Sequence, residues 1–596
     1  MELNAQNSSY RINNVPISGT NNSAFGFTSM NNTTTGSENA ACGFRSLTGL
    51  TSGNNNSALG SNALKTNTSG SDNSGFGYQA LFSNTTGSYN VASGSNALYT
   101  NSSGRSNIAN GSFALFSNST GNFNTAIGDS AMYNNMTDNN TGIGASALFS
   151  NASGSSNTAC GSKALYKNTG NSNSALGSES LLNNTTGNYN TSMGHATLKN
   201  NTTGHSNVAI GYYALASNTT GNGNVAIGYQ TLRYTNGIRN TAIGHLALTS
   251  NSTGAYNVAS GVMSLYTNTT GDDNVASGLY SLFSNSSGIS NTAIGDFALM
   301  SNTTGSYNAT FGSFSDVSSG TFTNATALGN GAIVNSTDKI RLGDANVTII
   351  EGQVAYTNPS DARFKTNIKE DEVKGLGFIK LLRPVVYNFD ARKFTEFLCK
   401  NMPDSIRKIH LDADFKTSTA IRQSGFIAQE VEKAAQEAGY DFNGIHKPND
   451  DNDNYSLAYS QFVVPLVKAV QEQQQMIEEQ KQLNEILQQR VNVLEKVNMT
   501  GITQPGATED FSMDQNIPNP FTHETVVSYT LPQRVNVAYM AVYDLSGKQI
   551  ASFPVTQKGS ATITITSEKL AAGIYIYSII ADGKILDSKR MVVAEK

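Results

Sequence analysis

The stretch GHSNVAIGYYALASNTT, residues 204–220, is one copy of a phrase that recurs through the first half of the chain. In each copy a Gly closes the pattern Asn-X-Ala-X-Gly or a near variant, and successive copies lie seventeen positions apart, or sixteen at three places. A fixed period of this kind predicts a stack of equivalent structural units. The eighteen closing glycines are Gly26, Gly43, Gly60, Gly77, Gly94, Gly111, Gly128, Gly144, Gly161, Gly177, Gly194, Gly211, Gly228, Gly244, Gly261, Gly278, Gly295 and Gly312.

One copy predicts one coil of a parallel β-solenoid. The Asn-Thr-Thr-Gly step and the Gly after Ile210 are turn signals, and the segments Asn-Val-Ala-Ile and Tyr-Ala-Leu are both expected to be short strands. The positions of Ala209 and Leu215 are nearly always small or aliphatic, which predicts a core one side chain wide. The Ile210 position also admits Ser93 and Ser260, so we expect it to be partly exposed or to lie at a subunit contact.

A single coil of this length cannot bury an apolar face alone, so stability must come from stacking. At a strand spacing of about 4.8 Å, eighteen coils would extend for roughly 85 Å. Stacking aligns equivalent residues, and Asn207, Asn224 and Asn240 are therefore expected to form a ladder of side chains. So thin a body would also gain from side-by-side association.

The phrases NVAIG and NTAIG resemble the head repeats of trimeric autotransporter adhesins. The resemblance implies a left-handed parallel β-roll that assembles as a trimer. The repeat of that family is usually shorter than the repeat of this chain, which leaves the shape of the coil open.

Composition limits the function classes. The chain has 596 residues, 55 Gly, 14% charged residues and no Trp, which is unusual for an enzyme of this length. The net charge of -5 contains no block of like charges, so neither a nucleic acid nor an anionic membrane is an expected partner. No apolar run approaches the roughly 20 residues of a transmembrane helix. The N-terminal MELNAQNSSYRINNVP lacks the regions of a secretory signal, which leaves a cytosolic protein or one whose signal has been removed.

Cysteines and histidines indicate no disulfide framework and no metal site. Cys42, Cys160 and Cys399 cannot form a complete set of internal disulfides. Cys42 and Cys160 fill the Ile slot of the repeat and are predicted to be packing residues, an inter-chain bridge being the alternative. His195 and His245 share one slot three coils apart, about 14 Å, too far to share a metal ion, and are expected on the surface. No cofactor is expected.

Residues 315–357 continue the repeat in a decaying form that predicts a neck or cap. After Pro359 the composition becomes that of a mixed globular domain, with GLGFIKLLRPVVYNF (375–389) and the helical pattern SGFIAQEVEKAAQEAG (424–439). In the second pattern the apolar residues recur at helical spacing and Gly439 is the expected stop.

A heptad pattern then predicts a coiled coil, with an amphipathic helix lying on its own domain as the alternative. Polar residues at positions a and d cost stability but fix the register and the number of strands. The a positions are Val463, Val470, Ile477, Asn484, Val491 and Asn498, and the d positions are Leu466, Gln473, Gln480, Leu487 and Leu494.

The segment SDARFKTNI, residues 360–368, contains three charged residues within five positions, after a long stretch with few. Together with GLGFIKLLRPVVYNF, GFIAQEVE and YSLAYSQFVVPLVKAVQEQ, this segment resembles the C-terminal intramolecular chaperone domain of phage tailspikes and endosialidases. The resemblance implies a domain that trimerises, guides folding of the fibre before it and often cuts itself off with a Ser–Lys dyad. It makes Ser360 the nucleophile and Lys365 the base, with Asp361, Arg363 and Asn367 completing the motif. Residues 390–423 depart from the family and look inserted.

The chemistry is plausible from the residues alone. A Ser hydroxyl needs a nearby base, and Lys serves only where desolvation or a neighbouring cation lowers its pKa from about 10.4. Residues five apart point away from each other on a regular helix or strand, so Ser360 and Lys365 need a turn or a neighbouring subunit to meet. The alternative is that Ser360 caps a helix and Lys365 is solvated.

The last module alternates in period two, as in TVVSYTLP and SATITIT, and predicts a small β-sandwich. Its phrases NIPNPF, VYDLSGKQI, LAAGIYIYSI and GKILDSKRMVV resemble the C-terminal sorting domain of type IX secretion cargo. The resemblance implies export across the outer membrane of a Bacteroidetes-type bacterium, with the tail removed and the cargo released or attached to surface lipopolysaccharide. It favours a removed signal peptide over a cytosolic protein. A cut at Ser360 in the periplasm would sever the repeats from this export tag.

The repeat pattern together with the three resemblances implies a secreted or surface-attached homotrimeric fibre that binds a surface, a glycan or a neighbouring cell, with self-cleavage as its only chemistry and the type IX machinery as partner. A tail fibre or tailspike of a phage-like particle is the alternative, and an ice-binding repeat protein is a further one, although the Thr pairs fall in turns. The repeats lack the clustered carboxylates of glycoside hydrolysis. The expected domains are an N-terminal segment (1–18), the β-roll (19–314), the neck (315–355), the chaperone domain (356–462), the coiled coil (463–498), a linker (499–510) and the sorting domain (511–596).

Overall fold

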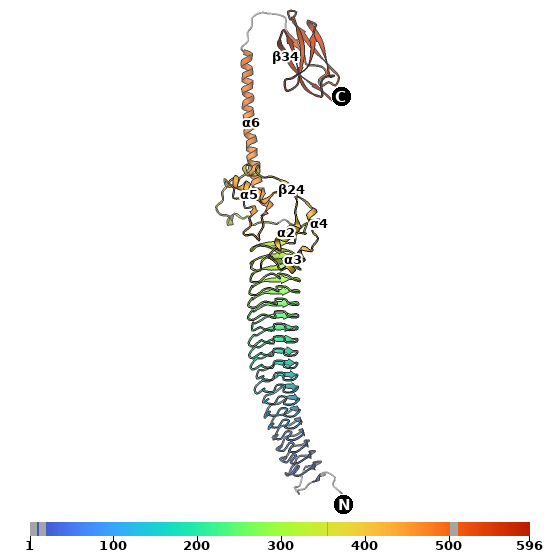
Figure 1. Ribbon diagram of the computed structural model, residues 1–596, viewed down its shortest axis with the longest axis vertical. Helices are drawn as coiled ribbons and strands as arrows, with labels where there is room; N and C mark the ends of the chain where they lie inside the picture. The colour runs from blue at the N-terminus through green and yellow to red at the C-terminus, as the bar shows by residue number, and fades with distance from the viewer. Residues whose placement is uncertain (1–8, 11–18, 355, 501–510, 596) are drawn as a thin grey trace. The chain divides into compact units, whose positions relative to one another are not determined.

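The computed structural model describes residues 9–10, 19–354, 356–500 and 511–595. The expected segment 1–18, apart from Ser9–Tyr10, and the expected linker, apart from its first two residues, lie outside the described residues. The chain divides into two compact units, Met1–Gln473 and Gln474–Lys596. The fold is mainly β, as predicted: a long parallel β-solenoid, then a small helical region and a sandwich-like C-terminal module (Figure 1).

The solenoid is one parallel sheet of 21 short strands in which equivalent residues of successive coils pair, as Ala209 does with Ala226. Its strands are β1 (Ser9–Tyr10), β2 (Ser23–Phe25), β3 (Ala40–Cys42), β4 (Ser57–Leu59), β5 (Ser74–Phe76), β6 (Val91–Ser93), β7 (Ile108–Asn110), β8 (Thr125–Ile127), β9 (Thr141–Ile143), β10 (Thr158–Cys160), β11 (Ser174–Leu176), β12 (Thr191–Met193), β13 (Val208–Ile210), β14 (Val225–Ile227), β15 (Thr241–Ile243), β16 (Val258–Ser260), β17 (Val275–Ser277), β18 (Thr292–Ile294), β19 (Ala309–Phe311), β21 (Thr326–Leu328) and β23 (Ile340–Leu342).

Each coil contributes one strand, so the prediction of a second strand at Tyr-Ala-Leu is wrong. Tyr213 and Leu215 have φ values of 56° and 53°, and the segment between them is a turn. This left-handed geometry turns the chain inward, so Leu215 is fully buried beside Ala209. Burial of these two positions confirms the predicted narrow core, and it explains why the sequence pattern looked strand-like.

The Ile slot faces outward, as predicted. Ile243 is 44% exposed, and Ser260 takes the same position in the next coil without burying its hydroxyl. Cys42 is exposed and Cys160 partly exposed at this slot. Both cysteines thus share the outward orientation of the Ile slot, because the strand turns this side chain away from the core.

The predicted asparagine ladder is present and fully buried. The Asn207 Oδ1 accepts from the Asn224 backbone N–H at 2.9 Å, and the Asn224 Oδ1 accepts from that of Asn240 at 2.9 Å. A second ladder, which we did not predict, runs through the Asn that begins each Asn-Thr-Thr step, with Asn218 Nδ2 donating to Asn201 Oδ1 at 2.8 Å. These amides satisfy backbone groups that no strand pairing reaches inside the coil.

Aromatic rings add outer columns along the solenoid. His195, Tyr212, Tyr229 and His245 stack in order with ring centroids 5.4, 5.5 and 5.1 Å apart. Both histidines are exposed, as the sequence predicted, and two tyrosine rings lie between them. A longer column has centroids 4.9–5.1 Å apart and consists of Phe82, Tyr99, Phe116, Tyr133, Phe149 and Tyr166.

The parallel ladder continues through the expected neck as far as Leu342 in β23. A second small parallel pair, β20 (Asp316–Val317) with β22 (Ile333–Val334), lines its interior. The Asp316 carboxylate is buried there and accepts from the backbone N–H groups of Ser301 and Val317. Burial raises the pKa of Asp316 to about 7, against the lowering effect of these hydrogen bonds.

The helical region after the solenoid has its own aromatic core around Phe378, Phe442 and Phe462. The predicted helix is present as α5 (Ala428–Glu437), with Val431 buried and Gly439 at φ 59° beyond its end. The other elements of this region are η1 (Ala362–Phe364), α1 (Leu376–Ile379), β24 (Val385–Asn388), α2 (Ala391–Leu398), α3 (Asp404–Leu411), α4 (Lys416–Ala420), β25 (Arg422–Gly425), β26 (Ile445–His446), β27 (Ser456–Leu457) and η2 (Tyr459–Phe462).

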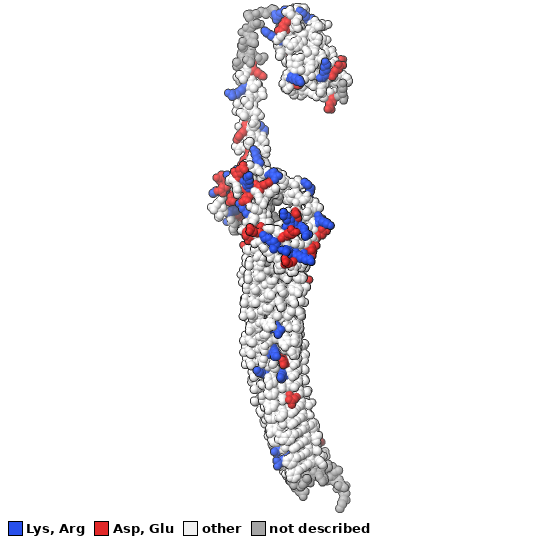
Figure 2. Space-filling view, in the orientation of Figure 1, with Lys and Arg blue, Asp and Glu red and all other residues white. Residues whose placement is uncertain are grey.

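The segment that looked inserted is an excursion between two paired strands. β24 and β25 are antiparallel neighbours, and α2, α3 and α4 lie between them in sequence. Figure 1 shows α2 and α3 against the last coils of the solenoid. Charged side chains are sparse on the solenoid and gather over the region that follows it (Figure 2).

The heptad segment is a single helix, α6 (Val463–Thr500). Its apolar a and d side chains from Val463 to Leu494 are each 44% to 63% exposed. The side chain of Asn498 lies outside the described residues.

The C-terminal module is the predicted β-sandwich-like fold, with Tyr577 and Met540 among its buried residues. One sheet has the order β28-β29-β32 and the other β31-β30-β33-β34. The strands are β28 (Ser512–Met513), β29 (Glu524–Leu531), β30 (Ala538–Tyr543), β31 (Gln549–Val555), β32 (Gly559–Thr566), β33 (Gly573–Ala581) and β34 (Lys584–Val593).

Candidate functional site

The charged segment after Pro359 forms a short 3-10 turn, η1. Asp361 is its N-cap and accepts from the Arg363 backbone N–H at 2.9 Å, so the cap is Asp361 and not Ser360. The Lys365 backbone N–H then donates to the Ala362 carbonyl at 3.2 Å. An Asp at this position supplies an acceptor for a free N–H at the start of the turn, which is why the chain bends here.

An ion pair closes over the same turn. The Arg363 guanidinium donates to Asp361 Oδ2 from Nε at 2.9 Å and from Nη2 at 2.6 Å. These hydrogen bonds, first the side-chain pair and then the backbone bond, hold the pKa of Asp361 below its usual value. The carboxylate therefore stays charged over the whole neutral range and keeps the turn closed.

The turn brings Ser360 and Lys365 together. Lys365 Nζ donates to Ser360 Oγ at 2.7 Å, within one chain. The predicted need for a turn is thus met by η1, without a neighbouring subunit. Asn367 lies just beyond with φ 54°, a conformation that Asn tolerates better than most residues. Among the described residues, no hydrogen bond joins Asn367 to Ser360 or Lys365.

The site is open to solvent. All described residues from 347 to 372 are exposed, including Ser360 and Lys365. A Lys acts as a base only after it has lost its proton, which desolvation favours, and this exposed segment supplies no desolvation. Ser360 and Lys365 are therefore in the contact that the predicted nucleophile and base would need, in surroundings open to water.

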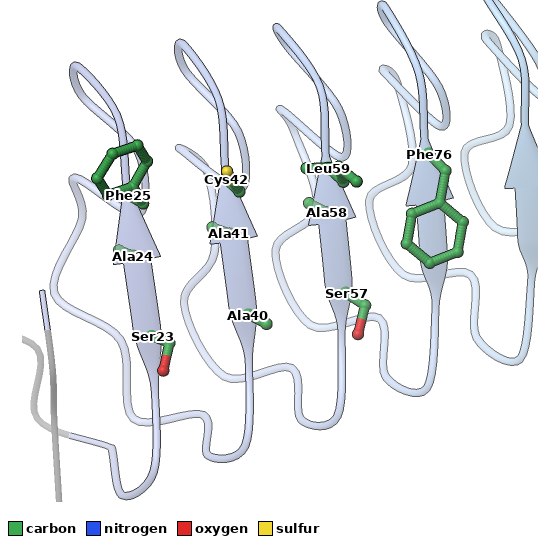
Figure 3. Close-up of a pocket in the computed structure, with 10 residues that line it drawn as sticks. All are labelled: Ser23, Ala24, Phe25, Ala40, Ala41, Cys42, Ser57, Ala58, Leu59 and Phe76. Atoms are coloured by element: carbon green, nitrogen blue, oxygen red, sulfur yellow. The ribbon is translucent and has the colours of Figure 1, made fainter.

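A second candidate surface is a shallow hollow of about 830 Å³ over the strands β2 to β5. Phe25, Cys42, Leu59 and Phe76 line it from the outward slot of successive coils, with Ser23 and Ser57 at the other end of the strands (Figure 3). The sequence signal was the larger side chains at this slot near the start of the solenoid. The lining contains no Asp, Glu, His, Lys or Arg and is mostly apolar, with the Cys42 thiol as its one reactive group, so it offers mainly apolar contact.

The described residues contain no group of three or more His, Cys, Asp and Glu side chains placed to hold a metal ion. Among the helices of the described chain, none is long and apolar enough to cross a bilayer.

Comparison with known proteins identifies two segments. Residues 360–440 match the family described as chaperone of endosialidase, and the match begins at Ser360. Residues 517–594 match the family described as secretion system C-terminal sorting domain. No curated protein matches the chain. With the solenoid, these matches describe a secreted, fibre-like protein that carries an intramolecular chaperone segment and a tail for the type IX secretion machinery.

Proposed function

We propose that this protein is a homotrimeric surface adhesin. The solenoid would be the adhesive shaft, residues 356–462 the chaperone domain that guides its folding, and residues 463–498 a trimeric coiled coil. The single observation that carries the assembly is α6, whose apolar a and d side chains are 44% to 63% exposed in one chain. A helix with such a stripe is stable in water when partner helices cover it.

The proposed adhesion rests on the repeated outer surface of the solenoid. The outward slot of the solenoid repeats in every coil, and Figure 2 shows few charges on its surface. Weak contacts of one coil with a glycan or a cell surface would be multiplied along the shaft and across three copies, which is how avidity gives strong attachment without a deep pocket.

The chaperone domain would also cut the chain before Ser360. Lys365, once neutral, takes the proton of the Ser360 hydroxyl, and Oγ attacks the carbonyl carbon of Pro359. The C–N bond breaks as the same proton passes to the nitrogen of Ser360, which leaves an ester that water hydrolyses. Packing of three copies over this exposed segment would remove water from the Lys and so make cleavage depend on assembly.

The test uses residues 1–500, expressed as the wild type and as Ser360→Ala. The wild type is expected to have the mass of a trimer in analytical ultracentrifugation and to give a fragment of about 359 residues on a denaturing gel. The Ser360→Ala protein should remain a trimer and stay intact. A monomeric wild type would contradict the fibre assembly, whereas a trimer that stays intact would contradict self-cleavage alone.

Deletion of residues 511–596 from the full chain tests the route to the surface. Loss of the shaft from intact cells, measured with an antibody to the solenoid, is the result expected for a type IX substrate. If the shaft is still displayed after the deletion, the alternative of a tail fibre of a phage-like particle is favoured.

A further inference from the structure

Two segments that follow Ser360 lie directly against the end of the solenoid. They are the helices α2 and α3, residues 391–411, and the loop 446–454. We infer that together they form a clamp that keeps the C-terminal part of the chain bound to the shaft after the chain is cut. The inference rests on the proposed self-cleavage for its role in the cell, but the contact itself exists in the uncut chain.

The first half of the clamp is apolar. Ile333 of β22 is 1% exposed and forms a buried cluster with four residues of the α2–α3 segment, each no more than 5% exposed. Phe297 and Met300 extend the cluster along the shaft. The four residues are Leu398 at the end of α2, Cys399 and Met402 between the two helices, and Ile406 in α3. Removal of these apolar side chains from water favours the contact, because the hydrophobic effect scales with the apolar area buried.

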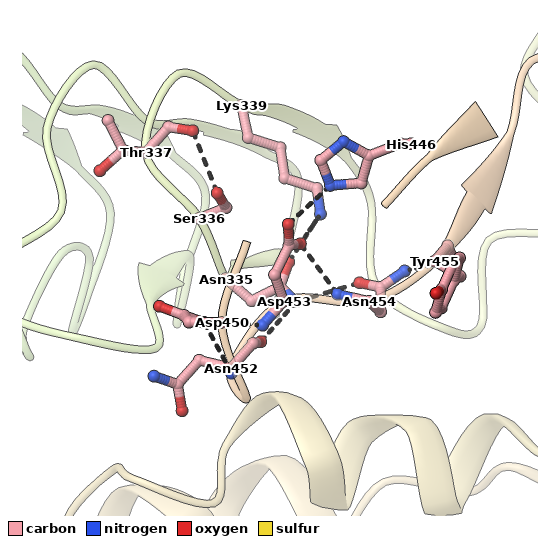
Figure 4. A network of polar contacts seen from close by, with 10 residues as sticks. All are labelled: Asn335, Ser336, Thr337, Lys339, His446, Asp450, Asn452, Asp453, Asn454 and Tyr455. Carbon is pink, nitrogen blue, oxygen red and sulfur yellow. Dashed lines mark hydrogen bonds and ion pairs between the residues drawn. The ribbon is translucent and has the colours of Figure 1, made fainter. Parts of the chain in front are cut away.

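The second half of the clamp is an ion pair between a partly exposed lysine and a buried carboxylate (Figure 4). Lys339 Nζ of the shaft donates to Asp453 Oδ1 at 3.0 Å, and the Asp453 side chain is 1% exposed. The other carboxylate oxygen, Oδ2, contacts His446 Nε2 at 2.6 Å. Burial alone would raise the pKa of Asp453, but the bonds from Lys339, the Asn454 backbone and His446 outweigh it and place the pKa below its usual value.

Hydrogen bonds of the Asn335 side-chain amide fix the orientation of this ion pair. Asn335 Nδ2 of the shaft donates to the Asn452 carbonyl at 2.9 Å and to Asn454 Oδ1 at 3.0 Å. The Asn335 Oδ1 in turn accepts from Lys339 Nζ at 2.9 Å. A buried carboxylate that lost Lys339 would be left partly uncompensated, which is costly enough to make the pairing specific.

The peptide link between shaft and clamp takes no part in these contacts. The described residues from 347 to 372 are exposed, and Ser360 lies in the middle of them. A cut before Ser360 therefore removes none of the interactions of Ile333 or Asp453. It removes only the covalent tether, which acts by raising the effective concentration of the two parts.

The clamp resolves the conflict between a cut at Ser360 and an export tail that lies beyond it. If the two fragments stay together, the sorting domain can still carry the shaft across the outer membrane after cleavage. The clamp helices belong to the segment that departs from the tailspike pattern. Their presence fits a chain whose chaperone part must remain attached.

The experiment makes the cut independent of Ser360. In full-length Ser360→Ala protein, residues 351–357 of the exposed link are replaced by the recognition sequence of a site-specific protease, and the purified protein is cut completely. The two fragments should separate on a denaturing gel but elute together in native size-exclusion chromatography. Separate elution of the two fragments in native buffer would overturn the clamp.

Matched variants locate the contact. Ile406→Asp should let the fragments elute apart, whereas Lys408→Asp, on the exposed face of the same helix, should not. If Ile406→Asp does not fold, Lys339→Met is the milder change and should speed fragment separation about tenfold or more, since 1.4 kcal/mol corresponds to a factor of ten. Fragments that stay together in both variants would show that other contacts hold them, which also overturns the clamp. Absence of self-cleavage in the wild type leaves this test intact.

Discussion

Lys365 Nζ donates a hydrogen bond of 2.7 Å to Ser360 Oγ because the two residues flank a turn that Asp361 and Arg363 close. The pair would diverge on a regular helix or strand. In the proposed self-cleavage, the turn would hold nucleophile and base in contact within one chain, so that trimer assembly would only have to remove water from them.

Asp361 is therefore expected to be a positioning residue for self-cleavage. Asp361→Ala removes the cap and the partner of Arg363, and should slow cleavage about 10- to 100-fold, since a displacement of roughly 1 Å has an effect of this size. Asp361→Asn keeps an acceptor for the turn, so its cleavage rate should lie between those of the wild type and Asp361→Ala. The measurement is the time course of fragment appearance on a denaturing gel.

The control for Asp361 is Glu370→Ala, an exposed acid in the same segment, which should cleave at the wild-type rate. A purely structural role would lower the yield of trimer together with the rate. Equal rates for wild type and Asp361→Ala trimers would contradict the positioning role.

The buried ladder makes a second prediction. Asn207→Ala leaves the Asn224 backbone N–H without its acceptor and removes the donor that serves the Gly221 carbonyl. Each buried group left unpaired costs about 1–3 kcal/mol, so thermal unfolding followed by circular dichroism should occur at a clearly lower temperature. Asn200→Ala, at an exposed position, should change it little. Equal melting of both variants would mean that the ladder does not hold the coils.

Gly211 tests the turn after each strand. Its φ is 125°, and a Cβ there would lie 2.3 Å from the Gly228 carbonyl oxygen of the next coil. Gly211→Ala should therefore disrupt stacking and expose the core to protease. Gly223 has φ 68° and its Cβ would meet nothing closer than 3.5 Å, so Gly223→Ala should cost only about 1 kcal/mol. Comparable protease resistance of the two variants would argue against close backbone contact between coils.

The buried carboxyl of Asp316 should make the stability of the end of the shaft depend on pH. The pKa of Asp316 is about 7 in the folded state and near 3.9 in the unfolded state. Its contribution to the free energy of unfolding is therefore fully present below about pH 3.9 and is lost as the pH rises through about 7. Asp316→Asn stays neutral and should be more stable than the wild type above pH 7, by on the order of 4 kcal/mol. Melting curves between pH 4 and pH 8 measure the difference.

For Asp316 the matched control is Asp129→Asn, an exposed carboxylate on the shaft, which should follow the wild-type pH dependence. Parallel curves for wild type and Asp316→Asn would show that the buried carboxyl does not titrate between folded and unfolded states in this range.

Much of the solenoid fold could be predicted from the repeat pattern of the sequence. The period, the Gly after Ile210 and the small residue at Ala209 predicted a stacked parallel sheet with a narrow core, and the aligned Asn207 and Asn224 predicted a ladder. The strand assigned to Tyr213–Leu215 was wrong because a buried Leu in a left-handed turn has the same apolar pattern as a buried Leu in a strand. Local propensity does not distinguish the two, and only the stacking of neighbouring coils selects the turn.

At the candidate site, the sequence by itself determined that Ser360, Lys365 and the charged pair Asp361 and Arg363 lie within six positions of one another. It also determined the repeat, because a fixed period leaves only one way to bury the same face in every coil. Only the tertiary structure decided that the inserted helices reach back to Ile333, and that Asp453 is buried against Lys339 from more than a hundred residues away. Such contacts depend on where the chain returns in space, and shape and charge complementarity between distant segments leave no periodic trace in the sequence.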